Sequence, residues 1–599
     1  MNYISIFFLL WFLIIYSNYL NLRFKIKFNE SFFLSICILI LSSFLLIKLD
    51  YNLTKFLFEY ILIFFCIISV VFIPNLLTNI NKINLKLNFE FIFLFILIFL
   101  LTKDRYYLDQ DEFAYWGMSL KAFPLSEPFR SFGKHFDHFF VSFDHHPQGL
   151  DLFRYVLSSP KFSEGIVIFS NNVILISGFY FLFYERKLIF LEKLLLFVIY
   201  YLLLNNLSFG FISIYADPIL AVFYACLLKK VFLISNKKDF KLDYSFILIF
   251  ITLFLVKRSS VIYGFYILYF FIGFSFLNYF REYQKKKSLY LYITILISLS
   301  ILILFLPKIL PQSYQLSINN ILNIFLSYEF YLKLYKFVIS PIYFSQFGVT
   351  LNGIINIIFS SSFNIYEFKI PLVFYLIFLT PLLFFKFNFR WFIFISSILI
   401  ILIHMSIILI TKTNFENLHI SALPRYIGII LISKYLFLIS IIIYKYKLIH
   451  KNFIILFLIL CFSLVTPKKS LGFFVPDSIY YKDLSNKRYK DNRNQISKLN
   501  LIKNNYQEII IVYEDGFSDF NNAYVTGEHT FYNNIIRYEL FPKQPKFIEY
   551  NKFIKNEKKY SSSKNLIILF DLNNDTSQKI NTADNIIKIK TYNKKKDEI

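Results

Sequence analysis

The sequence predicts a polytopic α-helical membrane protein, with about 12–14 transmembrane helices and a small C-terminal extracytoplasmic α/β domain. Hydrophobic residues make up 57% of the chain and charged residues only 17%, whereas an average soluble domain carries roughly 25% charged residues. The apolar residues are gathered in blocks that approach the ~20 residues needed to cross a bilayer. The charged residues lie mostly between these blocks, as expected of the loops of a membrane protein.

Each apolar block is predicted to be a helix, because a backbone in lipid must satisfy its own hydrogen bonds. The first block has no small-residue cleavage site, so we expect a retained helix rather than a signal peptide. All four cysteines fall inside apolar blocks and are expected to be packing residues. The candidate helices cover residues 4–20, 31–47, 56–75, 89–102, 165–184, 189–205, 216–233, 244–256, 259–277, 289–306, 370–385, 391–411, 426–443 and 453–466.

The distribution of the net charge of +25 predicts the topology. Basic residues cluster in alternate connections, and by the positive-inside rule these connections are cytoplasmic. Both termini and the long polar segments are then outside. The basic residues form no continuous face, which disfavours nucleic acid as a partner. The predicted parts are N-terminal transmembrane helices (1–102), a first long extracytoplasmic loop (103–160), a transmembrane core (161–466) with an outer loop (307–369), and an extracytoplasmic α/β domain (467–599).

The segment after Pro467 differs in character from the rest of the chain. Glu508 to Tyr513 and Leu566 to Leu572 have the composition of buried strands, and Phe520 to Leu540 has a helical pattern. It has no glycine-rich phosphate loop. The sequence therefore predicts a small α/β domain here.

The first long loop begins with an acidic cluster, Asp109, Asp111 and Glu112. The cluster follows a hydrophobic helix almost directly, so its carboxylates are predicted to lie at the outer membrane surface. Carboxylates this close repel one another, and one of them is a candidate general base. The alternative is a solvated helix cap, with Asp111 as the N-cap of a helix through Leu120.

Asp144, His145 and His146 lie near the end of the same loop. The loop holds four of the eight histidines of the chain, and a metal site built from His and Asp ligands is one interpretation. The spacing matches no zinc pattern, so no cofactor is expected and a divalent metal is the less favoured alternative. A polar loop returning to the membrane is the simplest interpretation.

The order of these motifs resembles that of the GT-C glycosyltransferases, in particular the branch with the protein mannosyltransferases and the lipid A aminoarabinose transferase. Asp111 and Glu112 follow an early membrane helix, an aromatic interfacial segment comes next, and His146-Pro147-Gln148-Gly149 enters the following helix. Further motifs resemble the family in the same order: Asp217-Pro218, Lys257-Arg258, Arg425-Tyr426 and Arg537 to Pro542.

The resemblance implies a membrane glycosyltransferase of the bacterial inner (plasma) membrane. It would move a sugar from a polyprenyl-phosphate donor to an extracytoplasmic glycan, lipid or protein acceptor in cell-envelope assembly. The resemblance implies Asp111 as the catalytic base, Glu112 as its neighbour and Asp144 as a candidate second carboxylate. The further site candidates are Asp109, His145, His146 and Asp217.

The lipid phosphate of such a donor needs cations at the membrane surface. Lys257 and Arg258 interrupt the hydrophobic run from Tyr244 to Leu277, and charges at such a boundary usually mark function. They are predicted to bind the lipid phosphate together with Arg425 and Tyr426, because an Arg fork holds phosphate in two bonds. The alternatives are that Lys257 and Arg258 fill a tight turn and that Arg425 snorkels to the headgroups.

Three other functions compete with this interpretation. An O-antigen-type polymerase or ligase favours a large outer loop rich in Arg and His, and segment 307–369 contains neither. A transporter or flippase of lipid-linked saccharides favours inverted repeats, and the sequence shows none. A structural assembly protein would use the outer α/β domain for binding.

Overall fold

The computed structural model divides the chain into two compact units, unit 1 with Met1–Arg105 and His146–Ser470 and unit 2 with Tyr106–His145 and Leu471–Ile599. The predicted division into N-terminal helices, first outer loop, transmembrane core and C-terminal domain stays a prediction. The structure describes residues 2–49, 61–79, 81, 83–105, 107, 117, 120–121, 149–158, 162–184, 188, 190–205, 207, 210–235, 243–257, 260–283, 400, 423–446, 503–513, 536–538, 540, 545–560, 564–570 and 586–589.

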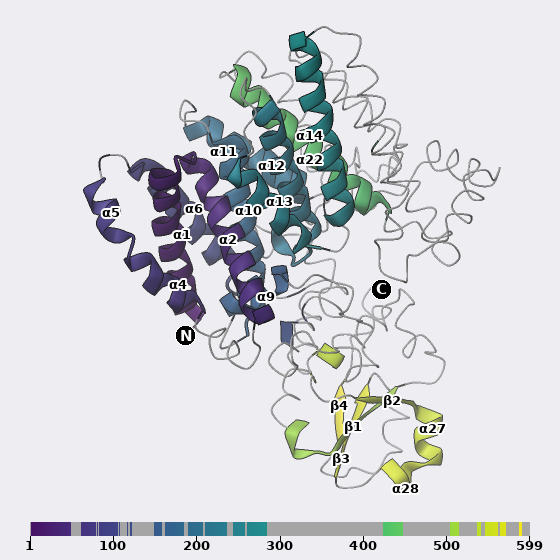
Figure 1. The fold of residues 1–599 in the computed structure, drawn as a ribbon. Helices are drawn as coiled ribbons and strands as arrows, with labels where there is room; N and C mark the ends of the chain where they lie inside the picture. The colour runs from purple at the N-terminus through teal and green to yellow at the C-terminus, as the bar shows by residue number, and fades with distance from the viewer. Residues whose placement is uncertain are drawn as a thin grey trace, which may run out of the picture. The chain divides into compact units, whose positions relative to one another are not determined.

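Unit 1 is a bundle of helices (Figure 1). A short 3-10 helix, η5 (Gly210–Ile212), precedes one of them. The described α-helices are α1 (Asn2–Phe24), α2 (Phe28–Leu49), α4 (Ile61–Val70), α5 (Ile73–Thr78), α6 (Leu85–Thr102), α9 (Gly149–Ser158), α10 (Glu164–Phe183), α11 (Phe190–Asn205), α12 (Asp217–Ser235), α13 (Tyr244–Phe254), α14 (Ser260–Tyr283) and α22 (Leu423–Tyr446).

Four helical segments of the described residues are long and apolar enough to cross a membrane: Ile4–Phe24, Phe28–Leu45, Leu85–Thr102 and Glu164–Phe183. The last of these is buried along its whole length, whereas α6 leaves Phe89 71% exposed. Exposing an aromatic ring costs about 25 cal/mol per Å² in water, but that cost disappears in hydrocarbon. The exposed apolar face supports the prediction of a helical membrane protein.

The helices α10 and α12 lie at the centre of the described bundle. They contact each other, and α10 also packs against α2, α6 and α9. Their approach is close because Gly178 faces Val222: a Cβ atom on this glycine would lie 2.2 Å from Val222 Cγ1. Small residues permit such close packing between membrane helices. Stacked aromatic rings fill the adjacent layer, where Phe32 and Phe91 have centroids 3.9 Å apart.

The predicted helices differ from the structure in two places. The span 56–75 was predicted as one helix, but α4 ends at Val70 and α5 begins at Ile73, with Pro74 in its first turn. Proline lacks the N–H that a continuous helix needs, which explains the break. The helix α9 was not predicted, because its hydropathy is interrupted by two charged residues that the fold buries. The predicted helices outside the described residues are 289–306, 370–385, 453–466 and, except for Ile400, 391–411.

Three of the cysteines have the predicted role. Cys37, Cys66 and Cys226 are free and buried in the bundle. Cys461 lies outside the described residues.

Unit 2 contains a parallel sheet in the order β2-β1-β3-β4. Its strands are β1 (Glu508–Tyr513), β2 (Lys546–Glu549), β3 (Asn565–Phe570) and β4 (Ile586–Ile589), and the helices α27 (Tyr550–Lys555) and α28 (Glu557–Tyr560) connect β2 to β3. Strand β1 has the predicted bounds, and β3 begins one residue before the predicted strand. Phe553 of α27 packs against Ile510, Val512, Ile567 and Leu569. Most of the predicted helical segment 520–540 lies outside the described residues.

A piece of the first long loop packs against the C-terminal segment inside unit 2. Lys121 Nζ donates a hydrogen bond of 2.9 Å to the Tyr538 carbonyl oxygen, and it lies 3.4 Å from the centroid of the Tyr538 ring. The rings of Tyr107 and Tyr538 have centroids 5.9 Å apart. Two segments that the charge pattern assigned to the same side of the membrane are thus joined.

Candidate functional site

Four buried charged residues gather where α9, α12 and the end of α13 meet. We call this group the charged junction; its members are Asp151, Arg154, Asp217 and Lys257. Figure 1 shows α9 at the end of the bundle where α1 begins. Charged residues are almost never fully buried unless they are paired, so the partners of each residue decide what the junction can do.

Lys257 and Asp217 form a buried ion pair. Lys257 Nζ lies 2.5 Å from Asp217 Oδ1, and the Asp217 side chain is fully shielded from solvent. Removing two charges from water is costly and is offset only by close pairing, so the loss of one partner would leave an uncompensated buried charge. The charge of Lys257 is therefore neutralised by the carboxylate of Asp217.

The local sequence explains why these two side chains meet. Helix α13 ends at Phe254 and α14 begins at Ser260, so Lys257 lies in a break within a long hydrophobic run. The Ser260 hydroxyl donates a hydrogen bond to the Lys257 carbonyl oxygen and closes this turn. Asp217 is the first residue of α12 and precedes Pro218. Proline suits the first turn of a helix, and an acidic residue there is stabilised by the helix dipole.

Arg154 is fully buried and uses its guanidinium to join three parts of the chain. Its Nη1 donates to Asp151 Oδ1 at 2.9 Å, and its Nε donates to Asn171 Oδ1 of α10 at 2.9 Å. Its Nη2 donates to the carbonyl oxygen of Ile214. Asn171 in turn donates to the Ser213 carbonyl oxygen at 3.1 Å. The segment before α12 is therefore held by side chains from α9 and α10.

The start of α9 lies directly against the end of α13. The Leu150 amide donates to the Leu255 carbonyl oxygen at 3.2 Å. At Gly149, an added Cβ atom would lie 2.5 Å from Leu255 Cβ, so only glycine allows this approach. Gly149 ends the His146-Pro147-Gln148-Gly149 segment, and Leu255 lies just before Lys257. Two of the motifs that carried the family resemblance are thus neighbours in the protein.

Of the predicted site residues, the structure brings together Lys257 and Asp217. Arg425 and Tyr426 belong to the first turn of α22, but their side chains are not described. The predicted site residues that lie outside the described residues are Asp109, Asp111, Glu112, Asp144, His145, His146 and Arg258.

Three residues of this site, Asp151, Arg154 and Asn171, were not among the predicted site residues. Asp151 and Arg154 could have been found from the sequence. They lie three residues apart in an otherwise apolar segment, and residues at this spacing are neighbours on one helix face. Asn171 offers no comparable signal, since it lies in a long apolar helix.

The charged junction has the groups to hold a helix break in place and to keep paired charges inside an apolar helix bundle. Among the described residues, no group of three His, Cys, Asp or Glu side chains is placed to hold a metal ion. Comparison with protein-family models, with curated proteins and with solved structures finds no match to this chain.

Proposed function

We propose that the protein is a membrane glycosyltransferase with a GT-C-like fold. It transfers a sugar from a polyprenyl-phosphate donor to an extracytoplasmic acceptor in cell-envelope glycan or glycoconjugate assembly. The observation that supports this most is the charged junction, in which the Lys257 break, the Asp217 helix start and the entry to α9 converge. The protein would lie in the bacterial inner membrane, with its C-terminal domain outside.

The pairing of Lys257 refines the predicted phosphate site. Because Lys257 is already neutralised by Asp217, we assign it a positioning role, in which the ion pair holds the break that carries Arg258. The phosphate ligands are then Arg258 and Arg425, with Tyr426 beside them. A guanidinium fork matches a phosphate group in two parallel hydrogen bonds, which a lysine cannot do.

The proposed reaction is a single displacement with inversion at the anomeric carbon. Asp111 accepts the proton of an acceptor hydroxyl or amine, and the nucleophile forms a bond to the anomeric carbon. The bond from that carbon to the phosphate oxygen breaks, and its electron pair leaves with the polyprenyl phosphate. A positioned base contributes about 10²–10⁴-fold to such a rate. Positively charged side chains that stabilise the leaving phosphate contribute about 10²–10³-fold.

The test uses the full-length protein in proteoliposomes with a panel of polyprenyl-phosphate sugars and a panel of glycan, lipid and protein acceptors, and it measures release of polyprenyl phosphate. Asp111→Asn should lower the release at least a hundredfold, in line with the loss of a general base. Asp104→Asn is the matched control, because Asp104 is an exposed acid that follows the end of α6 and precedes Asp111 in the chain. Wild-type release by Asp111→Asn, or no release by the wild-type protein from any donor, would contradict the proposal.

A flippase of lipid-linked saccharides is the second candidate, because of a buried lysine inside an apolar helix. Lys434 lies in the middle of α22 and is fully buried. In the described part of the chain, its Nζ has no hydrogen-bond partner, and it lies 3.3 Å from the centroid of the Phe270 ring. Ionisable residues within membrane helices often mark a transport path. Movement of the donor across proteoliposomes without release of polyprenyl phosphate would favour this candidate.

A further inference from the structure

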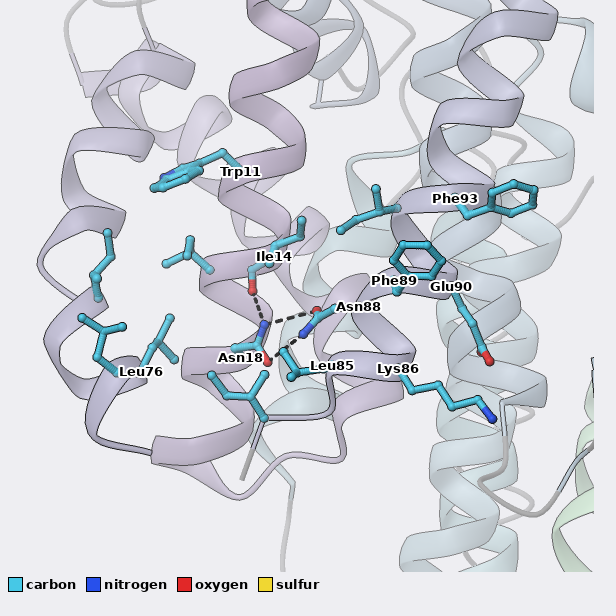
Figure 2. Close-up of a pocket in the computed structure, with 15 residues that line it drawn as sticks. Trp11, Ile14, Asn18, Leu76, Leu85, Lys86, Asn88, Phe89, Glu90 and Phe93 are labelled. Carbon is cyan, nitrogen blue, oxygen red and sulfur yellow. Dashed lines mark hydrogen bonds between the residues drawn. The ribbon is translucent and has the colours of Figure 1, made fainter. Parts of the chain in front are cut away.

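An apolar cavity of unit 1 lies away from the charged junction, between α1, α5 and α6 (Figure 2). Its volume is about 1060 Å³, and nearly all of its lining is apolar. Ligand sites usually have about 300–1,000 Å³, and a cavity of about 150 Å³ already holds benzene. The space is therefore large enough for a long hydrocarbon chain.

Two of the helices around this cavity, α1 and α6, are long and apolar enough to cross a membrane, and the third, α5, is a short helix of six residues. Trp11 and Ile14 line it from α1, Leu76 from α5, and Phe89 and Phe93 from α6. Phe89 and Phe93 also have large exposed surfaces. An apolar cavity does not hold water, so one that opens on the lipid-facing side of a membrane helix is filled by hydrocarbon.

The cavity changes in polarity along α6 (Figure 2). Lys86 lies in the first turn of the helix and Asn88 follows it. Phe93 lies about 10 Å from Lys86 along the helix axis, at 1.5 Å per residue. Asn88 and Asn18 pair through their amides, with distances of 3.2 and 3.4 Å. The order of cation, amides and aromatic ring matches the order of phosphate, ester and acyl chain in a phospholipid.

The charge at the polar end is positive. Glu90 also lines the cavity, but Lys193 neutralises it at 2.9 Å. Lys86 has no ion-pair partner in the part of the chain that the structure describes, so its ammonium gives the rim a net positive charge. An anionic headgroup complements this charge, whereas a zwitterionic one does not.

We propose that this cavity is a binding site for an anionic phospholipid, whose acyl chain lies between Trp11 and Phe93 and whose phosphate contacts Lys86. By the predicted topology, the lipid comes from the cytoplasmic leaflet. The site does not depend on the proposed transferase activity, because it is built from the first helices and shares no residue with the charged junction.

Trp11 provides the probe, because the chain has only three tryptophans. In a protein with Trp116→Phe and Trp391→Phe, Trp11 is the single fluorophore. This protein is placed in vesicles that mix an unlabelled lipid with either brominated phosphatidylglycerol or brominated phosphatidylcholine, and quenching of Trp11 gives the relative affinity. We expect a preference of about fivefold for phosphatidylglycerol, the effect of one lysine near an anionic headgroup.

Lys86→Gln should abolish this preference and leave quenching by phosphatidylcholine unchanged. Lys103→Gln is the matched control, because Lys103 follows the opposite end of the same helix and its variant should keep the preference. Equal quenching of the wild-type protein by both lipids, or an unchanged preference in Lys86→Gln, would overturn the proposal. Gel filtration of each variant separates loss of the site from loss of the fold.

Discussion

Lys257 and Asp217 lie 40 positions apart in the chain, yet their side chains meet at 2.5 Å inside the protein. This contact fixes the start of α12 against the break between α13 and α14. It explains how two apolar helices can be separated by a charged residue without leaving an uncompensated buried charge.

This relationship predicts the response of the ion pair to substitution. Asp217→Asn or Lys257→Met alone should destabilise the protein by about 3–5 kcal/mol, because each leaves one charge buried without its partner. The double variant should lose less than the sum of the two single losses. Chemical unfolding in detergent measures the three values, and strict additivity would show that the two residues are not coupled. Lys103 and Asp104 form an exposed pair, and their variants should have little effect.

The contact between Lys121 and Tyr538 predicts that the first long loop is protected by the C-terminal segment. Lys121→Met removes both the hydrogen bond and the cation–π contact, a loss of about 1–2 kcal/mol. We therefore expect cleavage of this loop by protease to become several times faster. Lys546→Met is the control, since its pair with Glu508 is exposed; equal cleavage rates in the two variants would refute the assignment.

Substitution of two buried lysines, Lys434 and Lys229, is expected to change the stability of the protein in opposite directions. Lys434 has no hydrogen-bond partner among the described residues, so Lys434→Met should stabilise the protein by about 1–3 kcal/mol. Lys229 Nζ donates to the carbonyl oxygens of Phe181 and Leu182, at 3.1 and 2.6 Å. Lys229→Met should therefore lower stability. Thermal unfolding in detergent compares the two, and a lower midpoint for Lys434→Met would indicate a favourable role for its ammonium.

The ion pair between Asp243 and Lys230 predicts a dependence of stability on pH. Burial alone would raise the pKa of Asp243, but the charge of Lys230 and the hydrogen bonds from Lys230 and Ser245 outweigh it and lower the pKa. A lowered folded pKa means that the unfolded state binds the proton more readily. The contribution to stability is therefore complete above the unfolded pKa of about 3.9, and it is lost as the pH falls through the lower folded pKa.

Asp243→Asn should remove this acid-dependent part of the unfolding free energy between neutral pH and pH 2. The control Asp104→Asn, at an exposed acid, should leave the pH profile unchanged. If the wild-type protein and Asp243→Asn lose stability in parallel as the pH falls, the pair contributes nothing that depends on pH.

The candidate site could be predicted only in part. Lys257 and Asp217 were visible because each interrupts or begins an apolar block, and hydropathy along the chain detects such positions. Arg154 was missed although its spacing from Asp151 is a usable signal, whereas Asn171 could not be found, because its role lies in a contact with the carbonyl oxygen of Ser213. Pairing between distant parts of a chain leaves no periodic trace in the sequence around either partner.

Local hydropathy along the chain was enough to predict that it forms membrane helices and where several of them end. This is so because the bilayer selects residues by local hydropathy and obliges an apolar backbone to become helical. The strand at Glu508–Tyr513 could also be predicted from its local sequence, because it is a short apolar run between polar segments. Three features became visible in the folded protein alone: Lys257 pairs with Asp217, α9 forms within the predicted polar loop, and Lys434 lies among aromatic rings. These features arise from the packing of helices distant in the chain, where burial makes each charge depend on the one partner that reaches it.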